Sequence, residues 1–217
     1  MISVEEALEA VLDLVEPLDA ENVALRAANG RVLAHPVTAQ RSQPPFAASS
    51  MDGYALRRAE VEPDAMFKVV GEAAAGHGYT GTLRAGQAVR IFTGAPVPEG
   101  ADFVVIQEDV TRRGDLITLG HRVDTKDNIR PAGGDFTMGE QLSASRILRP
   151  ADIALLAAMN IANVPVTRKP IIAILATGDE LVQPGEAPGP DQIIASNSYG
   201  LSAIFEDAGA EVRFFFF

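Results

Sequence analysis

The chain has 217 residues, of which 47% are hydrophobic, and its formal net charge is −11. It can bury one substantial core or a few smaller ones, but its acidic balance argues against binding to nucleic acid or to an anionic membrane, which both need a basic surface. The absence of cysteine excludes disulfides and thiolate chemistry and fits a reducing compartment, and three histidines without zinc-site spacing argue against a zinc enzyme. An anionic small ligand stays compatible with this charge where a metal ion or an arginine pair reverses the local field.

The first predicted element is an amphipathic helix from about Val4 to Val15. Ser3 and Glu6 form a capping-box pattern, apolar residues then recur at helical spacing, and Pro17 ends the run. The segment is acidic where a secretory signal needs positive charge, and no apolar run in the chain approaches membrane-spanning length. We therefore expect a cytoplasmic protein that does not bind membranes.

The run PPFAASSMDGYA, residues 44–55, suits neither a core helix nor a regular strand. Its prolines restrict the backbone, its small residues let a ligand or a second backbone come close, and Gly53 permits a turn directly after Asp52. We interpret Asp52 as a carboxylate that a tight loop presents for chemistry. The alternative is an ordinary loop whose aspartate bonds only nearby backbone amides, and these residues taken alone favour that alternative.

Short strand-like runs, FKVV, AVRIF, DFVVI and LITL, follow between Ala65 and Leu142 and are separated by glycine, proline and turn residues. They predict a compact antiparallel barrel or sandwich. Helical pattern returns at Pro150 and ends before Pro165. Because helical pieces flank the strands, we predict a β-barrel-like module at residues 46–136, inserted in an elongated helical and linker segment formed by residues 1–45 and 137–168.

Residues 169–217 are predicted to open an α/β domain with a parallel sheet. The run from Ile171 to Leu175 has no alternation, as expected for a parallel strand buried on both faces, and a short apolar run at Ile193 and a helix from about Ser198 follow. The chain stops where the next strand should begin, so we expect this domain to be incomplete. Truncation or an artefact explains the final run Phe214-Phe215-Phe216-Phe217 better than a native strand start or a true terminus.

Two candidate residues stand at ends of runs inside the β-like region. Thr93 precedes Gly94, so its hydroxyl and the neighbouring amides could face an anionic oxygen, although closing a turn explains Thr93 equally well. Asp135 follows the glycine pair that ends at Gly134, and an Asx turn or an ion pair with Arg130 explains it equally well.

A further candidate cluster follows the predicted parallel strand at Thr177, Gly178, Asp179 and Glu180. Open α/β sheets bind ligands at the carboxyl ends of their strands, so this placement favours function. A solvated acidic turn is the alternative.

Together these stretches resemble the molybdopterin molybdenumtransferase family, the MoeA-type proteins to which the E domain of gephyrin also belongs. The resemblance rests on PPFAASSMDGYA, RIFTGAPVPEGAD, NIRPAGGDF and KPIIAILATGDELVQPG, which occur here in the order and at about the spacing of the family. It extends from Met1 to about Val212.

The resemblance implies insertion of molybdate into adenylylated molybdopterin with release of AMP and use of Mg²⁺, in molybdenum cofactor synthesis. It implies catalytic roles for Asp52, Thr93, Asp135 and Glu180. The carboxylates among these are expected to bind Mg²⁺ or its waters, or else to orient a water as general base, and Thr93 is expected to donate to a phosphate or molybdate oxygen. Substrate contacts are expected from residues in the same motifs, namely Ser50, Gly94, Gly134, Thr177, Gly178 and Asp179.

The family forms elongated homodimers whose cleft lies between the β module of one subunit and the α/β domain of the other. Residues 1–45 and 137–168 would then be the dimerisation domain, and residues 169–217 part of a molybdopterin-binding domain. The molybdopterin adenylyltransferase is a candidate further partner. Family members continue past this chain with the rest of the α/β domain and a small β domain, so we expect catalysis by these 217 residues alone to be impaired.

Two rival classes stay open. A noncatalytic scaffold of the gephyrin type would keep the fold and bind peptide segments of partners. A CinA-type nucleotide-processing enzyme would account for the TGDE segment, but not for MDGYA or PAGGD.

Overall fold

The computed structural model describes residues 2–123 and 125–216, which form two compact units. One unit holds the residues up to Val37 together with those from Gln141 onward, and the other runs from Thr38 to Glu140. Met1, at the start of the predicted helical segment, and Phe217, the last residue of the phenylalanine run, lie outside the described residues.

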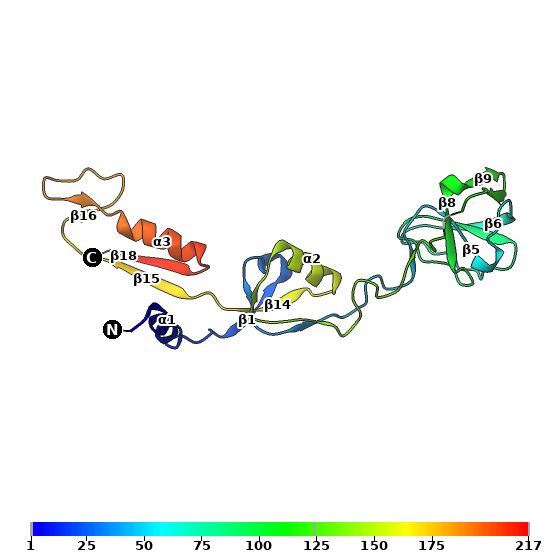
Figure 1. Cartoon of the computed structure of the whole chain (residues 1–217). Helices are drawn as coiled ribbons and strands as arrows, with labels where there is room; N and C mark the ends of the chain where they lie inside the picture. The colour runs from blue at the N-terminus through cyan, green and yellow to red at the C-terminus, as the bar shows by residue number, and fades with distance from the viewer. Residues whose placement is uncertain (1, 124, 217) are drawn as a thin grey trace. The chain divides into compact units, whose positions relative to one another are not determined.

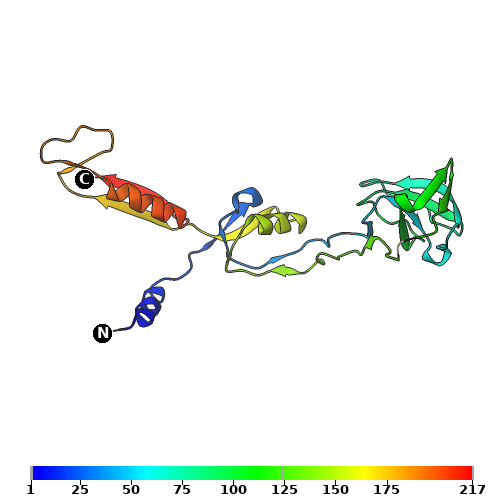
Figure 2. The ribbon, with the colours of Figure 1, turned by 45° about the horizontal axis from the view of Figure 1, so that its top comes forward.

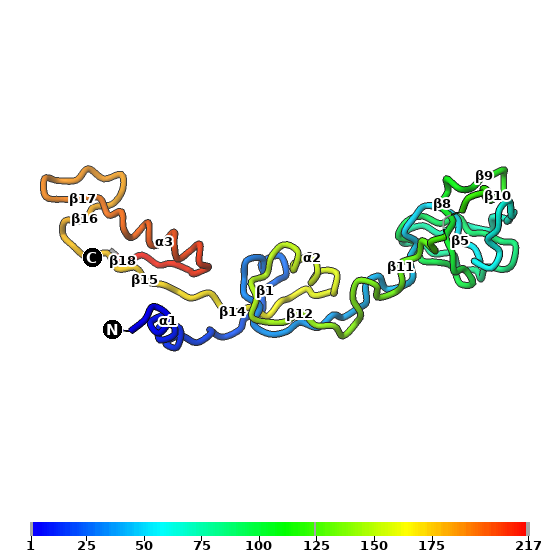
Figure 3. The backbone as a smooth tube through the Cα atoms, viewed as in Figure 1, coloured from blue at the N-terminus to red at the C-terminus, as the bar shows by residue number. Residues whose placement is uncertain are grey.

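The unit from Thr38 to Glu140 is built on one curled six-stranded sheet (Figure 1). Its strands are β5 Gly53–Leu56, β6 Met66–Ala73, β7 Gln87–Ile91, β8 Phe103–Ile106, β9 Val110–Arg113 and β10 Leu116–Leu119. They pair in the order β8-β5-β7-β6-β10-β9. Short 3-10 turns are η2 Arg58–Glu60 and η3 Gln107–Asp109, and β4 Ala48–Ser49 pairs with β11 Ile129–Arg130 beside the sheet (Figure 3).

The core of this unit includes strand β5, an interior strand of the sheet whose four residues are all buried. Its largest fully buried side chains include Leu56, Ile91, Phe103 and Ile117. The runs FKVV, AVRIF, DFVVI and LITL each fall within or overlap one of the strands β6, β7, β8 and β10, because apolar and β-branched residues fit a half-buried pleated surface.

The prediction of a purely antiparallel module is wrong in one respect, because β6 and β7 pair in parallel. Residues 74–86 connect the two strands, and a connection of a dozen or more residues is what a parallel crossover requires. The result is a single mixed sheet.

The prediction that Gly53 forms a turn is also wrong, since Gly53 is the first residue of β5. A Cβ on Gly53 would lie 1.9 Å from the carbonyl oxygen of Val105 on β8. Glycine is therefore required because the neighbouring backbone comes close, which is the other role expected for small residues in this run.

The other unit contains a four-stranded sheet where the sequence predicts a mainly helical segment, and that helical segment is not confirmed. The sheet consists of β1 Ala20–Ala24, β2 Val32–Leu33, β13 Arg146–Ile147 and β14 Asn163–Thr167, in the order β1-β14-β2-β13. Val164 and Val166 on β14 are fully buried and alternate with less buried residues, a strand pattern that the proline between them obscures in the sequence.

Two helices and several short elements belong to the same unit. Helix α1 Val4–Leu12 has the capping box that the sequence predicts, and none of its residues is buried. Helix α2 Pro150–Ala158 begins with proline in its first turn. The remaining short elements are η1 Leu25–Ala27, β12 Gln141–Leu142, which pairs with β3 Val37–Thr38, and the parallel pair β16 Leu181–Val182 and β17 Ile193–Ile194.

A parallel strand pair ends the described chain. Strand β15 Ile171–Ala176 pairs in parallel with β18 Glu211–Phe216, and helix α3 Asn197–Asp207 packs along both (Figure 2). The expectation that β15 is buried on both faces is wrong here, since Ile174 is buried but Leu175 is 60% exposed. In a two-stranded sheet with a single helix along it, much of the strand surface stays accessible.

Candidate functional site

Asp52 lies between β4 and β5 and is held by Thr93, which follows β7. The Thr93 amide and the Thr93 hydroxyl each donate a 2.8 Å hydrogen bond to Oδ1 of Asp52. Thr93 is exposed and Asp52 is half-buried, so the pair lies at the surface of the unit. The structure thus brings together two residues that the sequence analysis proposed separately.

The hydrogen bonds from Thr93 lower the pKa of Asp52 below its ordinary value of 3.8. The backbone bond contributes most and the hydroxyl bond next, because both favour the charged carboxylate. Partial desolvation opposes the shift, and the charge of Arg90 adds to it. Asp52 is therefore ionised at neutral pH, as a cation ligand must be.

A similar two-donor arrangement occurs between Thr137 and Glu140, where it only closes a turn. There the amide and hydroxyl of Thr137 both donate at 2.8 Å to a carboxylate three residues away. Asp52 and Thr93 are 41 positions apart. Their contact therefore depends on the tertiary fold, and the local-loop alternative does not explain it.

Backbone hydrogen bonds join residues 47–50 to the segment that contains Gly94 and to the segment that precedes Arg130. On one side the Ser49 amide donates to the Ala95 carbonyl at 3.0 Å, and the Gly94 amide donates back to the Ser49 carbonyl at 2.8 Å. On the other side the Ser50 amide donates to the carbonyl of Asn128 at 2.9 Å. Gly94 has φ +82°, a left-handed conformation that favours glycine, so the backbone conformation by itself explains why glycine occurs at this position.

Asp135 lies in the same unit but has a different partner. Its carboxylate forms a 2.5 Å ion pair with Arg130, as one of the two alternatives for this residue proposed. Its amide donates to the Gln43 carbonyl at 2.8 Å, and the amide of Gly134 donates to the carbonyl of Pro131 at 3.1 Å. Both members of the ion pair are exposed, so the pair contributes little to stability.

The TGDE residues belong to the other unit, after β15. Thr177 lines a pocket of about 290 Å³ together with residues of β15, β17 and the first turn of α3. Gly178 has φ +146°, and Asp179 and Glu180 are exposed. The carbonyl of Glu180 accepts from the Ile193 amide at 2.7 Å, and the carboxylate of this exposed residue lies close to the backbone of Gly178.

The predicted metal ligands do not form a ready-made cage. Among residues 2–123 and 125–216, there is no group of three or more histidine or acidic side chains placed to hold a metal ion. Magnesium usually binds one or two carboxylates and completes its coordination shell with water and phosphate oxygens. Single carboxylates such as those of Asp52 and Glu180 are compatible with this coordination.

Sequence reasoning missed Arg90 and Gln107, which the structure places beside Asp52. Arg90 donates to the Gly53 carbonyl at 3.2 Å and to Oε1 of Gln107 at 2.6 Å. A usable signal was present, since Arg90 is a charged residue within the otherwise apolar run AVRIF, three positions before Thr93.

Among the described residues, none of the helices combines the length and the hydrophobicity that crossing a membrane requires.

Comparison with protein families matches residues 2–160 to the family described as the MoeA N-terminal region, domains I and II. Among curated relatives, a molybdopterin molybdenumtransferase of Nostoc sp. is 39% identical over 97% of this chain and 51% of its own length. The molybdopterin molybdenumtransferase of Bacillus subtilis is 36% identical over 96% of this chain and 51% of its own length.

Among solved structures, a molybdopterin biosynthesis MoeA protein from Pyrococcus horikoshii superposes with a TM-score of 0.89 at 34% sequence identity. The match covers 100% of this chain and 60% of that protein. The chain thus spans about half the length of the curated relatives it matches.

Proposed function

This chain belongs to the MoeA family through its N-terminal region, and on that premise we propose that it is part of a molybdopterin molybdenumtransferase, an enzyme of molybdenum cofactor biosynthesis. The proposed reaction inserts molybdate into the dithiolene of adenylylated molybdopterin and releases AMP. The observation that carries the proposal is the ionised Asp52 carboxylate, which Thr93 holds at the surface through two hydrogen bonds.

We propose Mg²⁺ as the cofactor, with Asp52, Asp135 and Glu180 as its protein ligands or as ligands of its waters. When bound, the ion would neutralise the negative charge that a phosphate-linked substrate and an oxyanion bring together. Asp52 fits this role because both described hydrogen bonds to its carboxylate go to Oδ1, which leaves Oδ2 for the cation. Asp135 fits it less well, because Arg130 pairs with its Oδ1 and the charge of that guanidinium repels a cation at the other oxygen.

The other motif residues are proposed to contact substrate. The Thr93 hydroxyl donates to Asp52 in this structure, so its proposed donation to a phosphate or molybdate oxygen requires that the hydroxyl turn. Backbone amides and hydroxyls of the remaining motif positions, Ser50, Gly94, Gly134, Thr177, Gly178 and Asp179, would hold the rest of the substrate.

We also propose the assembly that the family resemblance implies. Residues 1–45 and 137–168 would form a homodimer interface, residues 46–136 the inserted module, and residues 169–217 part of an α/β molybdopterin-binding domain. The site would combine Asp52, Thr93 and Asp135 of one subunit with Glu180 of its partner. A cytoplasmic location and transfer of substrate from the molybdopterin adenylyltransferase complete the proposal.

AMP release tests the proposed activity. We expect Asp52→Ala and Asp135→Ala, introduced into a protein that has the length of the relatives, to reduce molybdate-dependent AMP release from adenylylated molybdopterin in Mg²⁺ by about 100-fold or more. Asp115→Ala is the matched control, because Asp115 is an exposed aspartate of the same unit outside the motifs. Thermal unfolding should stay near that of the unsubstituted protein, and equal damage to folding and to activity would make these acids structural.

The same assay separates the rival functions. The apolar face of α1 is exposed, with Val4 at 84% and Leu8 at 57%, and such a surface suits contact with another chain, either the second subunit of the proposed homodimer or the partner of a scaffold. A folded protein of full family length that releases no AMP would therefore point to the scaffold. The CinA-type alternative has no support from the family match at residues 2–160, which lies outside the segment that it would explain.

A further inference from the structure

The Arg90 guanidinium lies close to two aromatic rings. Arg90 lies opposite Tyr54 in the pairing of β5 with β7, and it shares a strand face with Phe92, two positions along the chain. Its guanidinium carbon is 5.1 Å from the ring centroid of Tyr54 and 4.7 Å from that of Phe92. Contacts of this kind with two rings restrict the plane of the guanidinium group.

The hydrogen bonds of Arg90 reach two backbone carbonyls at Asp52 and Gly53, one of them directly and the other through Gln107. One terminal nitrogen donates to the carbonyl of Gly53, the residue after Asp52, at 3.2 Å. The other donates to Oε1 of Gln107 at 2.6 Å, and the backbone amide of Gln107 donates to the Asp52 carbonyl at 3.0 Å. Arg90 thereby joins the start of β5, strand β7 and the turn after β8 around one residue.

These described bonds go to neutral oxygens and not to the Asp52 carboxylate. A guanidinium that paired directly with Asp52 would occupy a carboxylate oxygen and repel a cation, as Arg130 would at Asp135. The arrangement at Asp52 instead keeps a positive charge nearby while leaving carboxylate oxygen accessible.

We propose that Arg90 is a positioning residue for Asp52. Arg90 acts through the Gly53 carbonyl and through Gln107 to aim the Asp52 carboxylate at the divalent cation and at the phosphate-bearing substrate. The inference rests on the proposed function for what Asp52 binds, but the positioning itself can be measured without catalysis. It requires the fork of donors that arginine has and lysine lacks.

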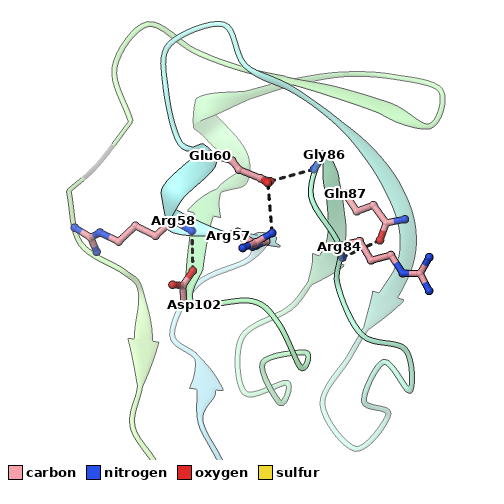
Figure 4. A network of polar contacts seen from close by, with 7 residues as sticks. All are labelled: Arg57, Arg58, Glu60, Arg84, Gly86, Gln87 and Asp102. Carbon is pink, nitrogen blue, oxygen red and sulfur yellow. Dashed lines mark hydrogen bonds and ion pairs between the residues drawn. The ribbon is translucent and has the colours of Figure 1, made fainter.

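Three variants of the chain separate positioning from charge and from general packing. Arg90→Gln removes the charge and the fork, whereas Arg90→Lys keeps the charge but cannot span both acceptors. Arg84→Gln is the control with the same change of charge in the same unit. Its backbone amide donates to Gln87 at 3.0 Å, while its side chain extends away from the other labelled residues (Figure 4).

The first measurement is amide hydrogen exchange by NMR in the 217-residue chain. We expect the amides of Thr93 and Gln107, which both donate to Asp52, to exchange about tenfold faster in Arg90→Gln and in Arg90→Lys than in the unsubstituted chain. The amide of Leu119, which donates to Ala65 at 2.9 Å, is the reference and should keep its rate. Arg84→Gln should change none of them.

Three results would overturn the inference. Wild-type protection in Arg90→Lys would show that charge alone suffices. A uniform increase in exchange rate that includes Leu119 would show a general packing role, and unchanged rates in both Arg90 variants would show no role.

The second measurement is AMP release by the longer protein, where we expect both Arg90 variants to lower kcat with little change in KM. If the unsubstituted longer protein releases no AMP, the proposed function fails, and the positioning of Asp52 is then decided by exchange alone.

Discussion

Replacing Gly53 by alanine should destabilise the curled sheet strongly, because the added methyl group would meet backbone and not a movable side chain. The new Cβ would lie 1.9 Å from the Val105 carbonyl oxygen and 2.9 Å from its carbon. Bringing the shorter contact to about 3 Å, below which real Cβ atoms essentially never approach, means moving β8 away from β5 by about 1 Å.

The cost follows from what that movement disturbs. Strands β5 and β8 pair from Gly53 with Ile106 to Leu56 with Phe103, at the centre of the core cluster. Overpacking of a core costs about 1–3 kcal/mol, and each weakened ladder bond adds about 1 kcal/mol. We therefore expect Gly53→Ala to lower the free energy of unfolding of this unit by about 3–5 kcal/mol, a large part of the stability of a typical domain.

The assay must report on one unit at a time, since the two units need not unfold together. The chain has no tryptophan, so hydrogen exchange of β5 and β8 amides at increasing urea concentration is a suitable probe. Gly114→Ala is the matched control, because Gly114 has φ +60° with no atom near the new Cβ, and it should cost only about 1–2 kcal/mol. If Gly53→Ala costs no more than Gly114→Ala, the close approach of β8 is not what requires glycine.

Three further predictions concern single side chains. Because the pKa of folded Asp52 is lowered, its stabilising contribution is present above the ordinary value of 3.8 and is lost as pH falls through the folded pKa. Thr93→Ala should therefore be less stable than the unsubstituted chain at pH 7 and should approach it in acid, as read from urea unfolding at both pH values. Asp152→Ala should cost about 1–3 kcal/mol by the same method, because it removes the bond to the Arg149 amide and the ion pair with Arg146, whose exposed guanidinium water can solvate, and Asp152→Asn should cost less. Gly200→Ala, inside α3 with open space around it, should slow amide exchange in that helix by an amount equivalent to about 0.5–1 kcal/mol.

The sequence predicts local elements well where apolar spacing decides them. The capping box at Ser3 and the strand at Ile171 appear where expected, because each depends on neighbours a few positions away. The parallel pairing of β6 with β7 and the sheet formed by β14 depend on distant partners, and short strands interrupted by proline give little periodicity to read. Because these short strands show no clear period of two, the sequence predicts a mainly helical segment where the structure has a four-stranded sheet.

At the site, the sequence identifies the chemical groups but not their contacts. Asp52 and Thr93 each stand out by motif, yet nothing in either motif states that one binds the other. The same limit explains why Arg90 was missed, because its role depends on Gly53 and Gln107, which lie 37 and 17 positions away. Spacing along the chain carries no information about partners that only pairing of β5 with β7 and β8 brings together.

The two carboxylates of the curled-sheet unit differ in a way that orders their proposed roles. Asp52 is held by uncharged donors on one oxygen, whereas Asp135 is held by the charge of Arg130. Among the described residues no ion pair holds Asp52, whereas a cation at Oδ2 of Asp135 is repelled by the Arg130 guanidinium on Oδ1. That exposed pair is weak, and a phosphate or molybdate oxygen would offer the released guanidinium a replacement anion. Asp52 is therefore suited to hold the metal before substrate binds, and Asp135 to join it once an anion has drawn Arg130 away.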